Sequence, residues 1–568
     1  MTLRQRKWWR VLAVITALAL VAAACGDDDD EEGQPDTTDE TSAPDVQDGG
    51  TLVIGAEQEP ECTDWIASCS GSSWGYWMMN VTTLPRSFDI VKDGEDWVYE
   101  YNSDLLTGEP VLDDSTDKPT VTYEINPEAV WSDGEPITST DFKYTWEQIA
   151  TGDDIYDTTG YADVESVDDS DPSVAVVTYS KVYAGWKGIF GGQYGILPSH
   201  ILEGQDRSAM MANGYEFSGG PWKIDRWEKG VQAVLVPNEN WWGEPPILDE
   251  VVFQFITDTS AEFQAFQSGQ VSAIYPQPQP DTVAAIEQGV EGAGTDFTGE
   301  TGNLEALWFN NSAFPFDTVA ARQAFSYAID RPALVERLFG PLGVTEPSNA
   351  LNPPIFSGVS DVDAFSFYEQ DVDKVAELLE GDGWVKGDDG IYAKDGQKFA
   401  ATLKTTTGNA RRELTAEVLQ AQLEEVGIQL DISLQEAGDL FGDQLPRGDF
   451  QVALYAQVAT TLEPALCAIL CSKNIPSEAN NQSGQNWQRV SIPEMDPLLE
   501  TVDGSLDQDE RVAAQKEADG IMAENAVALP LDPLPNILLW KEAEIVGDLF
   551  SHPILGPFWN IHTWGLAA

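Results

Sequence analysis

The chain has 568 residues, with 30 lysines and arginines against 96 aspartates and glutamates, which gives a formal net charge of −66. A polyanion of this strength repels phosphate backbones and anionic lipid headgroups, which argues against partners bound through basic patches, nucleic acid included. The 42% hydrophobic content and 19 tryptophans can fill large cores, whereas three histidines are too few to favour a His-rich metal site.

The first 24 residues are predicted to be an export signal. Four basic residues precede an apolar run, Val11 to Ala24, which is shorter than the roughly 20 residues that a membrane span needs. The run ends in small residues before Cys25 and resembles a bacterial lipoprotein signal. We therefore expect lipidation of Cys25 and an extracytoplasmic, lipid-anchored protein. The alternative is an ordinary secretory signal followed by an incidental cysteine.

Residues 25–50 are predicted to be an acidic, disordered tether. Positions 26–50 hold eleven acids, no base and almost no apolar side chain, so they repel one another and cannot bury a core. A calcium-binding role is the alternative, but the aspartates lack the ordered ligand spacing of a calcium loop.

Four further cysteines are expected to form disulfides, because an exported protein folds under oxidising conditions. Their close spacings favour the pairs Cys62–Cys69 and Cys467–Cys471 among three possible connectivities. A site in which four thiolates bind a metal is the weaker alternative, since neither pair has zinc-knuckle spacing.

The rest of the chain alternates predicted strands and helices, which indicates an α/β protein. Strands are expected at 51–56, 120–125 and 428–434, the last following directly after a helix. Helices are expected at 138–150, 260–268 with Gly269 as its stop, 317–330 with Asp317 as its cap, 371–380, 410–426 ending at Gly427, and 508–525.

No catalytic motif is found in the sequence. It contains no G-x-S-x-G elbow, no H-E-x-x-H pair and no P-loop, and its carboxylate pairs are too numerous to be informative. We therefore predict no catalytic residues, no bound metal and no cofactor, and expect a protein that is not an enzyme.

Residues 121–149 contain one recognisable signature. The run Trp131-Ser-Asp-Gly-Glu-Pro-Ile-Thr138, continued by Asp141 and Phe142, resembles the W-S-D-G-x-P-[LIV]-T-x-x-D-[VF] segment of extracellular solute-binding proteins of family 5. An Asp-Gly turn followed by Thr138 and Asp141 suits the start of a helix, so these residues are predicted to be scaffold rather than ligand contacts.

Further matches follow in the order that the family shows. They are Ile196-Leu-Pro-Ser-His200, Gly219-Gly-Pro-Trp222, Trp241-Trp-Gly243, the unit 248–273, Arg322 to Arg331, Leu423 to Ile428 and Ala528 to Leu531. The resemblance thus covers about residues 50–535.

The resemblance implies a two-lobed, periplasmic-binding-protein-like α/β fold of type II (cluster C), with an extra domain inserted in lobe one. Lobe one would comprise 51–78, 210–300 and 530–568, the inserted domain 79–209, and lobe two 301–529. Such proteins bind a solute between lobes that close by hinge motion, and deliver it to the permease and ATPase of an ABC importer. We expect a monomer that binds an oligopeptide or similar bulky solute and contacts the membrane only through its lipid.

The expected binding residues follow from position in the family. In oligopeptide receptors of the family an aspartate holds the peptide amino group; Thr460 stands at that position here, with Glu463 nearby. The full set of expected ligand contacts is Glu57, Gln58, Trp74, Tyr76, Trp77, Trp308, Asn310, Gln457, Thr460, Glu463 and Trp487. A cationic solute drawn to Glu57, Glu59 and Glu463, a non-peptide metabolite, a signalling role and an exported hydrolase remain as alternatives.

Overall fold

The computed structural model describes residues 46–94, 96–192, 194–299, 301–356, 363–463, 466–480 and 483–568. The predicted signal, Cys25 and most of the predicted tether lie outside these ranges. Within them, no helix has the length and apolar character that crossing a membrane requires.

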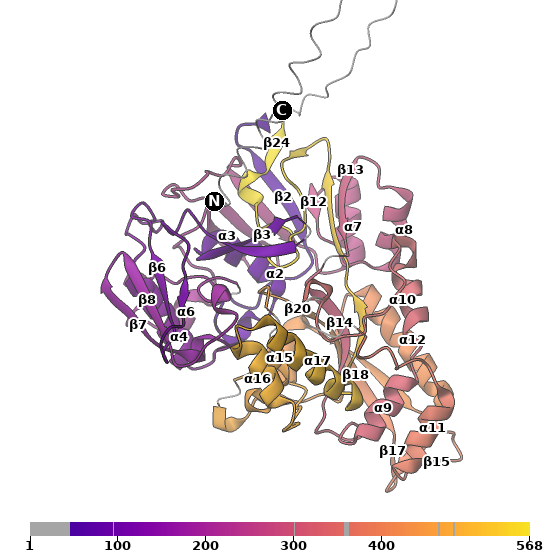
Figure 1. Ribbon diagram of the computed structural model, residues 1–568. Coiled ribbons are helices and arrows are strands. Elements are labelled where there is room, and N and C mark those ends of the chain that lie inside the picture. The colour runs from indigo at the N-terminus through magenta and orange to yellow at the C-terminus, as the bar shows by residue number, and fades with distance from the viewer. Residues whose placement is uncertain are drawn as a thin grey trace, which may run out of the picture. The chain divides into compact units, whose positions relative to one another are not determined.

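A seven-stranded sheet is built from segments near both ends of the chain (Figure 1). In order across the sheet, its strands are β13 (Ala293–Thr298), β22 (Asn536–Lys541), β12 (Ala273–Ile274), β2 (Thr51–Ala56), β11 (Glu250–Phe255), β10 (Gln232–Pro237) and β9 (Trp222–Glu228). Strand β2 runs parallel to both of its neighbours, β11 and β12.

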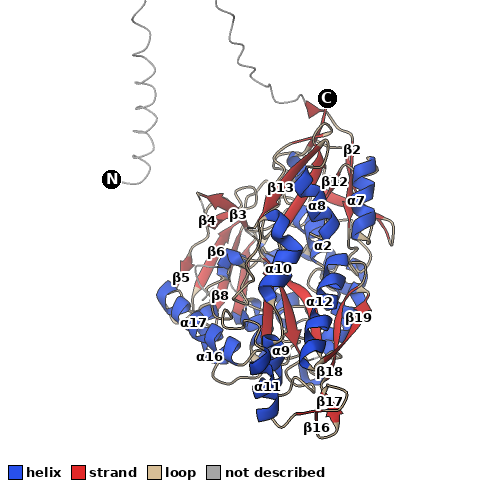
Figure 2. Cartoon of the chain, turned by 90° about the vertical axis from the view of Figure 1, so that its right-hand side faces the viewer, coloured by secondary structure: helices blue, strands red, loops and turns tan. Residues whose placement is uncertain are grey.

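Both faces of this sheet are covered, because alternate residues of a strand point to opposite sides. Leu52 and Ile54 belong to one apolar core, while Val53 packs against another. The second core is closed by helices α7 (Thr259–Ser268) and α8 (Pro280–Gln288), which lie beside β12 and β13 in Figure 2.

A five-stranded sheet forms the centre of the other large core. Its order is β19 (Gln429–Gln435), β18 (Ala400–Thr406), β20 (Val452–Val458), β14 (Asn303–Phe309) and β21 (Ala528–Pro533), with β18 parallel to β19 and β20. Every residue of β14 is buried. Helices that contribute apolar residues to this core include α9 (Val319–Tyr327), α10 (Arg331–Phe339), α11 (Val372–Gly381), α12 (Ala410–Val426), α15 (Leu466–Leu470), α16 (Asp496–Gly504) and α17 (Gln508–Glu524).

The chain passes between the two sheets twice. The first passage connects β13 to β14, and the second runs through Leu534 and Pro535 between β21 and β22. The second passage therefore lies a little beyond residue 530, where the sequence predicts the boundary between lobes.

Residues 79–209 contribute two smaller antiparallel sheets. One is the hairpin of β3 (Phe88–Asp93) and β4 (Asp96–Tyr101). The other is four-stranded, with the order β5 (Leu112–Asp113), β6 (Thr120–Glu124), β8 (Val174–Tyr179) and β7 (Val164–Asp171), and α4 (Ser139–Thr151) lies beside it (Figure 1). The shorter helices α5 (Ser199–Leu202) and α6 (Arg207–Met211) follow.

The family signature is scaffold, as predicted. Thr138 and Asp141 form a capping box at the start of α4, in which the Asp141 carboxylate accepts a hydrogen bond from the Thr138 backbone N–H. The same carboxylate accepts a hydrogen bond from Nε1 of the fully buried Trp131, 3.2 Å away. This segment therefore links the entry of the helix to the core.

One predicted helix is shorter than expected. The segment predicted as 317–330 forms α9, which ends at Tyr327, and Asp330 then caps a second helix, α10, which begins at Arg331. The cap of α9 is Thr318 rather than Asp317: Thr318 Oγ1 accepts the Ala321 N–H and also donates to the Asp382 carboxylate at 3.0 Å.

The described body begins earlier than the tether prediction implies. Val46 and Gln47 form a short strand, β1, which pairs with β24 (Gly565–Ala567); β24 also pairs with β23 (Ile545–Val546). The pairing uses backbone groups, so the polar composition of the segment does not prevent it.

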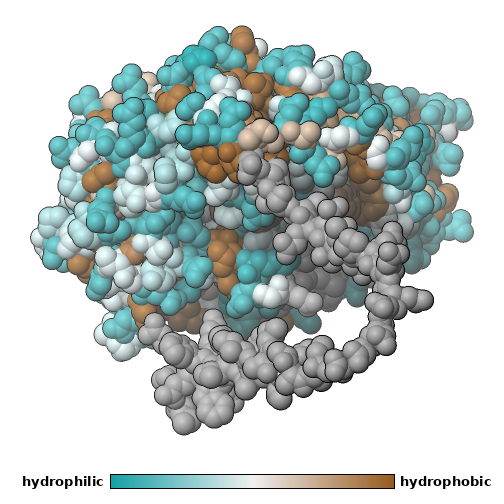
Figure 3. Space-filling view, turned by 90° about the horizontal axis from the view of Figure 1, so that it is seen from above, coloured by the Kyte–Doolittle hydropathy of each residue, from teal (hydrophilic) through white to brown (hydrophobic). Residues whose placement is uncertain are grey.

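Figure 3 shows apolar residues scattered among hydrophilic ones on one face of the molecule.

Candidate ligand-binding site

A cavity of about 630 Å³ lies where strands of both large sheets end. Its lining includes the residues that directly follow the parallel strands β2, β11 and β12 on one side, and β18, β19 and β20 on the other. In open α/β sheets ligands bind outside the carboxyl ends of the strands, and the volume falls within the range of about 300–1,000 Å³ typical of ligand pockets.

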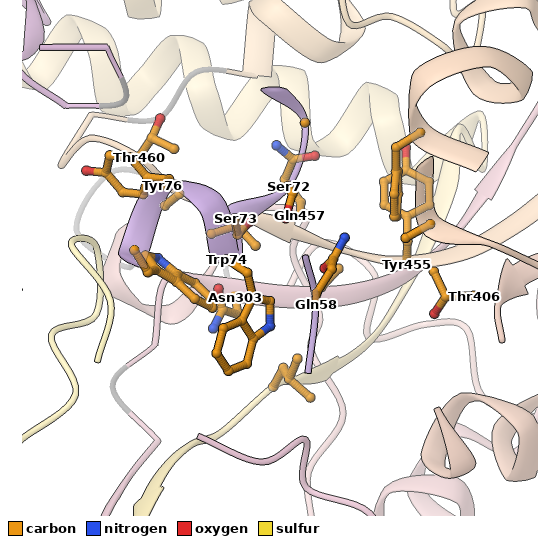
Figure 4. A pocket seen from close by; sticks show the side chains of 18 of the residues that line it. Gln58, Ser72, Ser73, Trp74, Tyr76, Asn303, Thr406, Tyr455, Gln457 and Thr460 are labelled. Carbon is orange, nitrogen blue, oxygen red and sulfur yellow. The ribbon is translucent and has the colours of Figure 1, made fainter. Parts of the chain in front are cut away.

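All but two of the predicted binding residues line this cavity. Those present are Glu57, Gln58, Trp74, Tyr76, Trp77, Gln457, Thr460, Glu463 and Trp487. Figure 4 shows several of them around one space, with Gln58, Trp74 and Tyr76 on the N-terminal segments and Gln457 and Thr460 on β20 and the loop after it.

The predictions for Trp308 and Asn310 are wrong, because neither side chain lines the cavity and both are buried in the core around the five-stranded sheet. Trp308 is fully buried, stacks on Tyr455 with ring centroids 5.4 Å apart, and donates to the Tyr455 carbonyl at 3.0 Å. The Asn310 amide donates to the carbonyls of Gly448 and Phe450, each at 3.1 Å. Trp308 supports Tyr455, which does line the cavity.

One wall of the cavity is aromatic. The rings of Trp74, Trp77 and Tyr275 contact one another with centroids 5.4 to 6.0 Å apart. Tyr455 and Trp487 form a second aromatic contact on the opposite side, with centroids 6.2 Å apart. Aromatic faces bury large apolar areas and suit the hydrocarbon part of a ligand.

The carboxylates predicted to attract a cation have partners within the protein. The Glu59 carboxylate accepts hydrogen bonds from Trp227 Nε1 at 2.7 Å and from the Gly230 N–H. Glu463 forms an ion pair with Arg511. Glu57 accepts the Gln277 N–H at 3.0 Å.

Glu57 also lies against Glu262, and burial raises the pKa of both carboxyl groups. Two carboxylates that cannot be hydrated do not both ionise side by side, so the pair retains a proton at neutral pH. The two carboxyl groups share this proton, so the Glu57–Glu262 pair brings at most one negative charge to the cavity.

A buried ionic cluster lies next to the cavity. Glu305, in β14, forms ion pairs with Arg411 at 3.1 Å and Arg412 at 2.8 Å, and Arg412 lines the cavity. Burial alone would raise the pKa of Glu305, but the two guanidinium charges outweigh it and hold that pKa below its ordinary value. Asp532 lies opposite Glu305 on β21, and burial raises its pKa to about 7.

Both predicted disulfides are present and adjoin the cavity. Cys62 and Cys69 are bonded just before the lining residues Ser70 to Ser73, and Cys467 and Cys471 are bonded within and after α15. Among the described residues, no three His, Cys, Asp or Glu side chains come together as metal ligands would.

Several lining residues were missed by the sequence reasoning. They include Tyr275 and Gln277 after β12, Thr406 at the end of β18, Asn303 at the start of β14, and Asn352 and Tyr455. The position of a polar residue directly after a parallel strand, as for Tyr275, is the signal that could have found some of them.

Comparison with known proteins agrees with this geometry. Residues 95–472 match the model of the bacterial extracellular solute-binding proteins, family 5 Middle. The oligopeptide-binding protein OppA of Mycobacterium tuberculosis (strain H37Rv) is 26% identical over 507 residues, which cover 86% of this chain and 81% of that protein.

Solved structures show the same fold. The oligopeptide-binding protein AppA of Bacillus subtilis, in complex with a nonapeptide, superposes with a TM-score of 0.80 at 22% identity, covering 92% of this chain and 100% of that one. An oligopeptide-binding protein of Thermus thermophilus, complexed with a pentapeptide, gives 0.78 at 22% identity and covers 91% and 96%. The periplasmic-binding-protein-like fold is thereby confirmed, and the chain belongs to the bacterial extracellular solute-binding proteins of family 5.

Proposed function

We propose that this protein is the lipid-anchored, extracytoplasmic receptor of an ABC importer, that it binds an oligopeptide in the cavity, and that it catalyses no reaction. The observation that carries the proposal is the cavity itself, which is lined by segments that follow strands of both large sheets. The peptide assignment rests on the relatives, two of which were solved with a nonapeptide and a pentapeptide bound.

The proposed lobes are those predicted from the sequence: 51–78, 210–300 and 530–568 for lobe one, 301–529 for lobe two, and 79–209 as the inserted domain. The grouping of the strands into separate sheets and the two passages between the large sheets support this division, except that β21 extends lobe two to Pro533 and the second passage lies at Leu534 and Pro535. A ligand that contacts both lobes only when they are closed stabilises the closed state, and the permease would then receive that state.

Several hydrogen bonds already join segments assigned to different parts, and two of them show this clearly. The Leu462 N–H donates to the Tyr99 hydroxyl at 2.9 Å, and Arg411 Nη2 donates to Gln277 Oε1 at 3.4 Å. Opening the proposed hinge would break such contacts, so the arrangement described here corresponds to the closed side of the proposed equilibrium.

Lipidation of Cys25, a monomeric state and partnership with a permease and an ATPase complete the proposal. The lipid anchor would keep the receptor at the membrane while the acidic segment after it provides reach. A Cys25→Ala variant is expected to leave the membrane fraction and appear in the soluble fraction of the cell envelope or in the medium. Retention of that variant in the membrane fraction would disprove the anchor.

The binding function is tested with protein that lacks the first 25 residues. Native mass spectrometry of the purified protein is expected to show co-purified peptides of mixed sequence. Titration calorimetry with a pool of short peptides is expected to show saturable binding at one site. Gln457→Ala, in the cavity, should weaken binding about tenfold, whereas Gln397→Ala, on the exposed strand β17 (Gln397–Lys398), should not change it. A single non-peptide metabolite in the spectra, with no response to peptides, would refute the peptide assignment.

A further inference from the structure

The cavity is lined by uncharged polar groups that have no hydrogen-bond partner among the described residues. Ser72 Oγ, Asn303 Oδ1 and both amide atoms of Asn352 are buried and accept or donate no hydrogen bond among the described residues. The three residues are only 4–5% exposed. Buried polar atoms are nearly always paired in folded proteins, so a cluster of unpaired ones around one cavity indicates that a ligand completes them.

Half-buried amides extend this neutral lining. Gln58 and Gln457 line the cavity, and their side chains form no hydrogen bond with the described residues. Figure 4 shows Gln58, Ser72, Asn303 and Gln457 around the same space. The set offers both donors and acceptors, which is what the N–H and C=O groups of an amide-bearing ligand require.

The charged residues that line the cavity are largely occupied by the protein itself. Arg412 is paired with Glu305, Glu463 with Arg511, and the Glu59 carboxylate with Trp227 and a backbone N–H. The other buried or capping acids are engaged as well: Glu57 with Gln277 and Glu262, Asp157 with Thr159, and Asp258 with the first turn of α7.

Two other acids, Glu61 and Glu436, line the cavity and are not paired in this way. Glu436 is exposed to solvent, where water screens its charge. Glu61 is close to Gly438, two residues after Glu436 in the chain, and burial raises the pKa of the Glu61 carboxyl group to about 7. A ligand ammonium could be held only at this edge, which makes Glu61 the residue to test against the proposal.

We propose that the cavity selects ligands that are uncharged where they bind; this inference rests on the proposed function. A peptide with a blocked amino terminus therefore binds more tightly than the same peptide with a free amino terminus. An ammonium group that enters the cavity loses its hydration and meets amides and hydroxyls in place of a free carboxylate. A blocked terminus adds instead one more amide that the unpaired groups can satisfy.

The test compares pairs of peptides that differ only in amino-terminal acetylation, titrated by calorimetry into protein lacking residues 1–25. The acetylated member of each pair is expected to bind about tenfold more tightly or better. Equal or tighter binding of the free peptides would overturn the inference and leave the proposed function standing. If neither form binds, the proposed function fails and the inference with it.

Variants connect the preference to particular residues. Gln457→Glu places a carboxylate in the cavity and is expected to raise the affinity for the free peptide relative to the acetylated one by about tenfold. Asn352→Leu removes two unpaired polar atoms; it should weaken binding of the acetylated peptide about tenfold while leaving the melting temperature unchanged or higher. A lower melting temperature with unchanged affinity would show a structural role and contradict the assignment.

Glu61→Gln is the matched control, because Glu61 is a half-buried acid of the lining and no hydrogen bond or ion pair joins its carboxylate to another side chain of the described residues. If the inference is right, this variant keeps the preference for acetylated peptides. If Glu61 anchors an amino terminus, the variant loses affinity for free peptides alone, and the inference is overturned.

Discussion

Replacement of Glu305 by glutamine tests the buried ionic cluster beside the cavity. Glu305 and Arg411 have fully buried side chains, and Glu305 is the partner of both Arg411 and Arg412. Glu305→Gln keeps the size of the side chain but removes the negative charge between two guanidinium groups. Arg411 is poorly compensated otherwise: its Nε and Nη1 atoms have no partner among the described residues, and its other contact is with Gln277 Oε1 at 3.4 Å.

The expected loss in the free energy of unfolding is about 3–5 kcal/mol, which is typical when one partner of a buried ion pair is removed. Asp532 makes this loss depend on pH. Burial raises its pKa to about 7, and the neighbouring Glu305 charge also raises it. Once Glu305 is neutral, Asp532 ionises more easily and can compensate Arg411. The loss should therefore be largest below pH 7 and smaller above it.

Urea unfolding followed by tryptophan fluorescence measures the effect, one pH unit below and one above that pKa of about 7. The control is Glu165→Gln, which removes an exposed ion pair with Lys118 and should change the free energy of unfolding by less than about 1 kcal/mol. Equal losses in the two variants, or a loss in Glu305→Gln that grows with pH, would refute the reasoning.

Three further predictions concern other parts of the chain. Burial raises the pKa of Glu57 above its ordinary value of 4.5, so the folded protein keeps a proton that the unfolded chain releases, and stability falls as pH rises above 4.5. Glu57→Gln should therefore flatten the dependence of the urea midpoint on pH. An unchanged dependence of the midpoint on pH would contradict this. The double variant Cys62→Ser/Cys69→Ser opens a short loop and should lower the free energy of unfolding by about 2.5 kcal/mol. It should also weaken ligand binding, because Ser72, three residues after Cys69, lines the cavity. Undiminished affinity would show that the disulfide does not shape the site. Thr138→Ala removes the cap of α4 and should lower the free energy of unfolding by about 1 kcal/mol. Ligand affinity should not change, since Thr138 lies outside the cavity lining. A change in affinity would show that the signature segment around Trp131 to Phe142 is more than scaffold.

The elements that sequence patterns predicted well are those whose ends depend on residues close in the chain. Helices α7 and α12 end at Gly269 and Gly427, which adopt the left-handed conformation that glycine tolerates best. The capping box of α4 is equally local. Asp317 and Thr318 could both cap α9, and a distant residue decides between them: Thr318 also bonds to Asp382.

When both faces of a strand are buried, the sequence cannot predict which of its side chains line a cavity. Trp308 and Asn310 lie on or just after β14, where every residue is buried, so polarity along the strand does not separate core from cavity. Asn352, in contrast, comes from a loop with no regular pattern, which Leu351 anchors in the core around the five-stranded sheet. Composition and spacing carry no information about such a residue.

The sequence by itself determined the acidity of the protein, most of its helices and strands and its family, because these depend on composition, local spacing and short motifs. It favoured the disulfide pairs that the structure contains. The tertiary structure decided which charges remain available to a ligand. Glu463 is paired by Arg511, and Glu57 shares burial with Glu262, from segments far away in the chain. Folding decides which carboxylates are paired and which lose their water, because it brings distant segments together. Residues that look acidic in the sequence therefore line a cavity in which few charges remain available to a ligand.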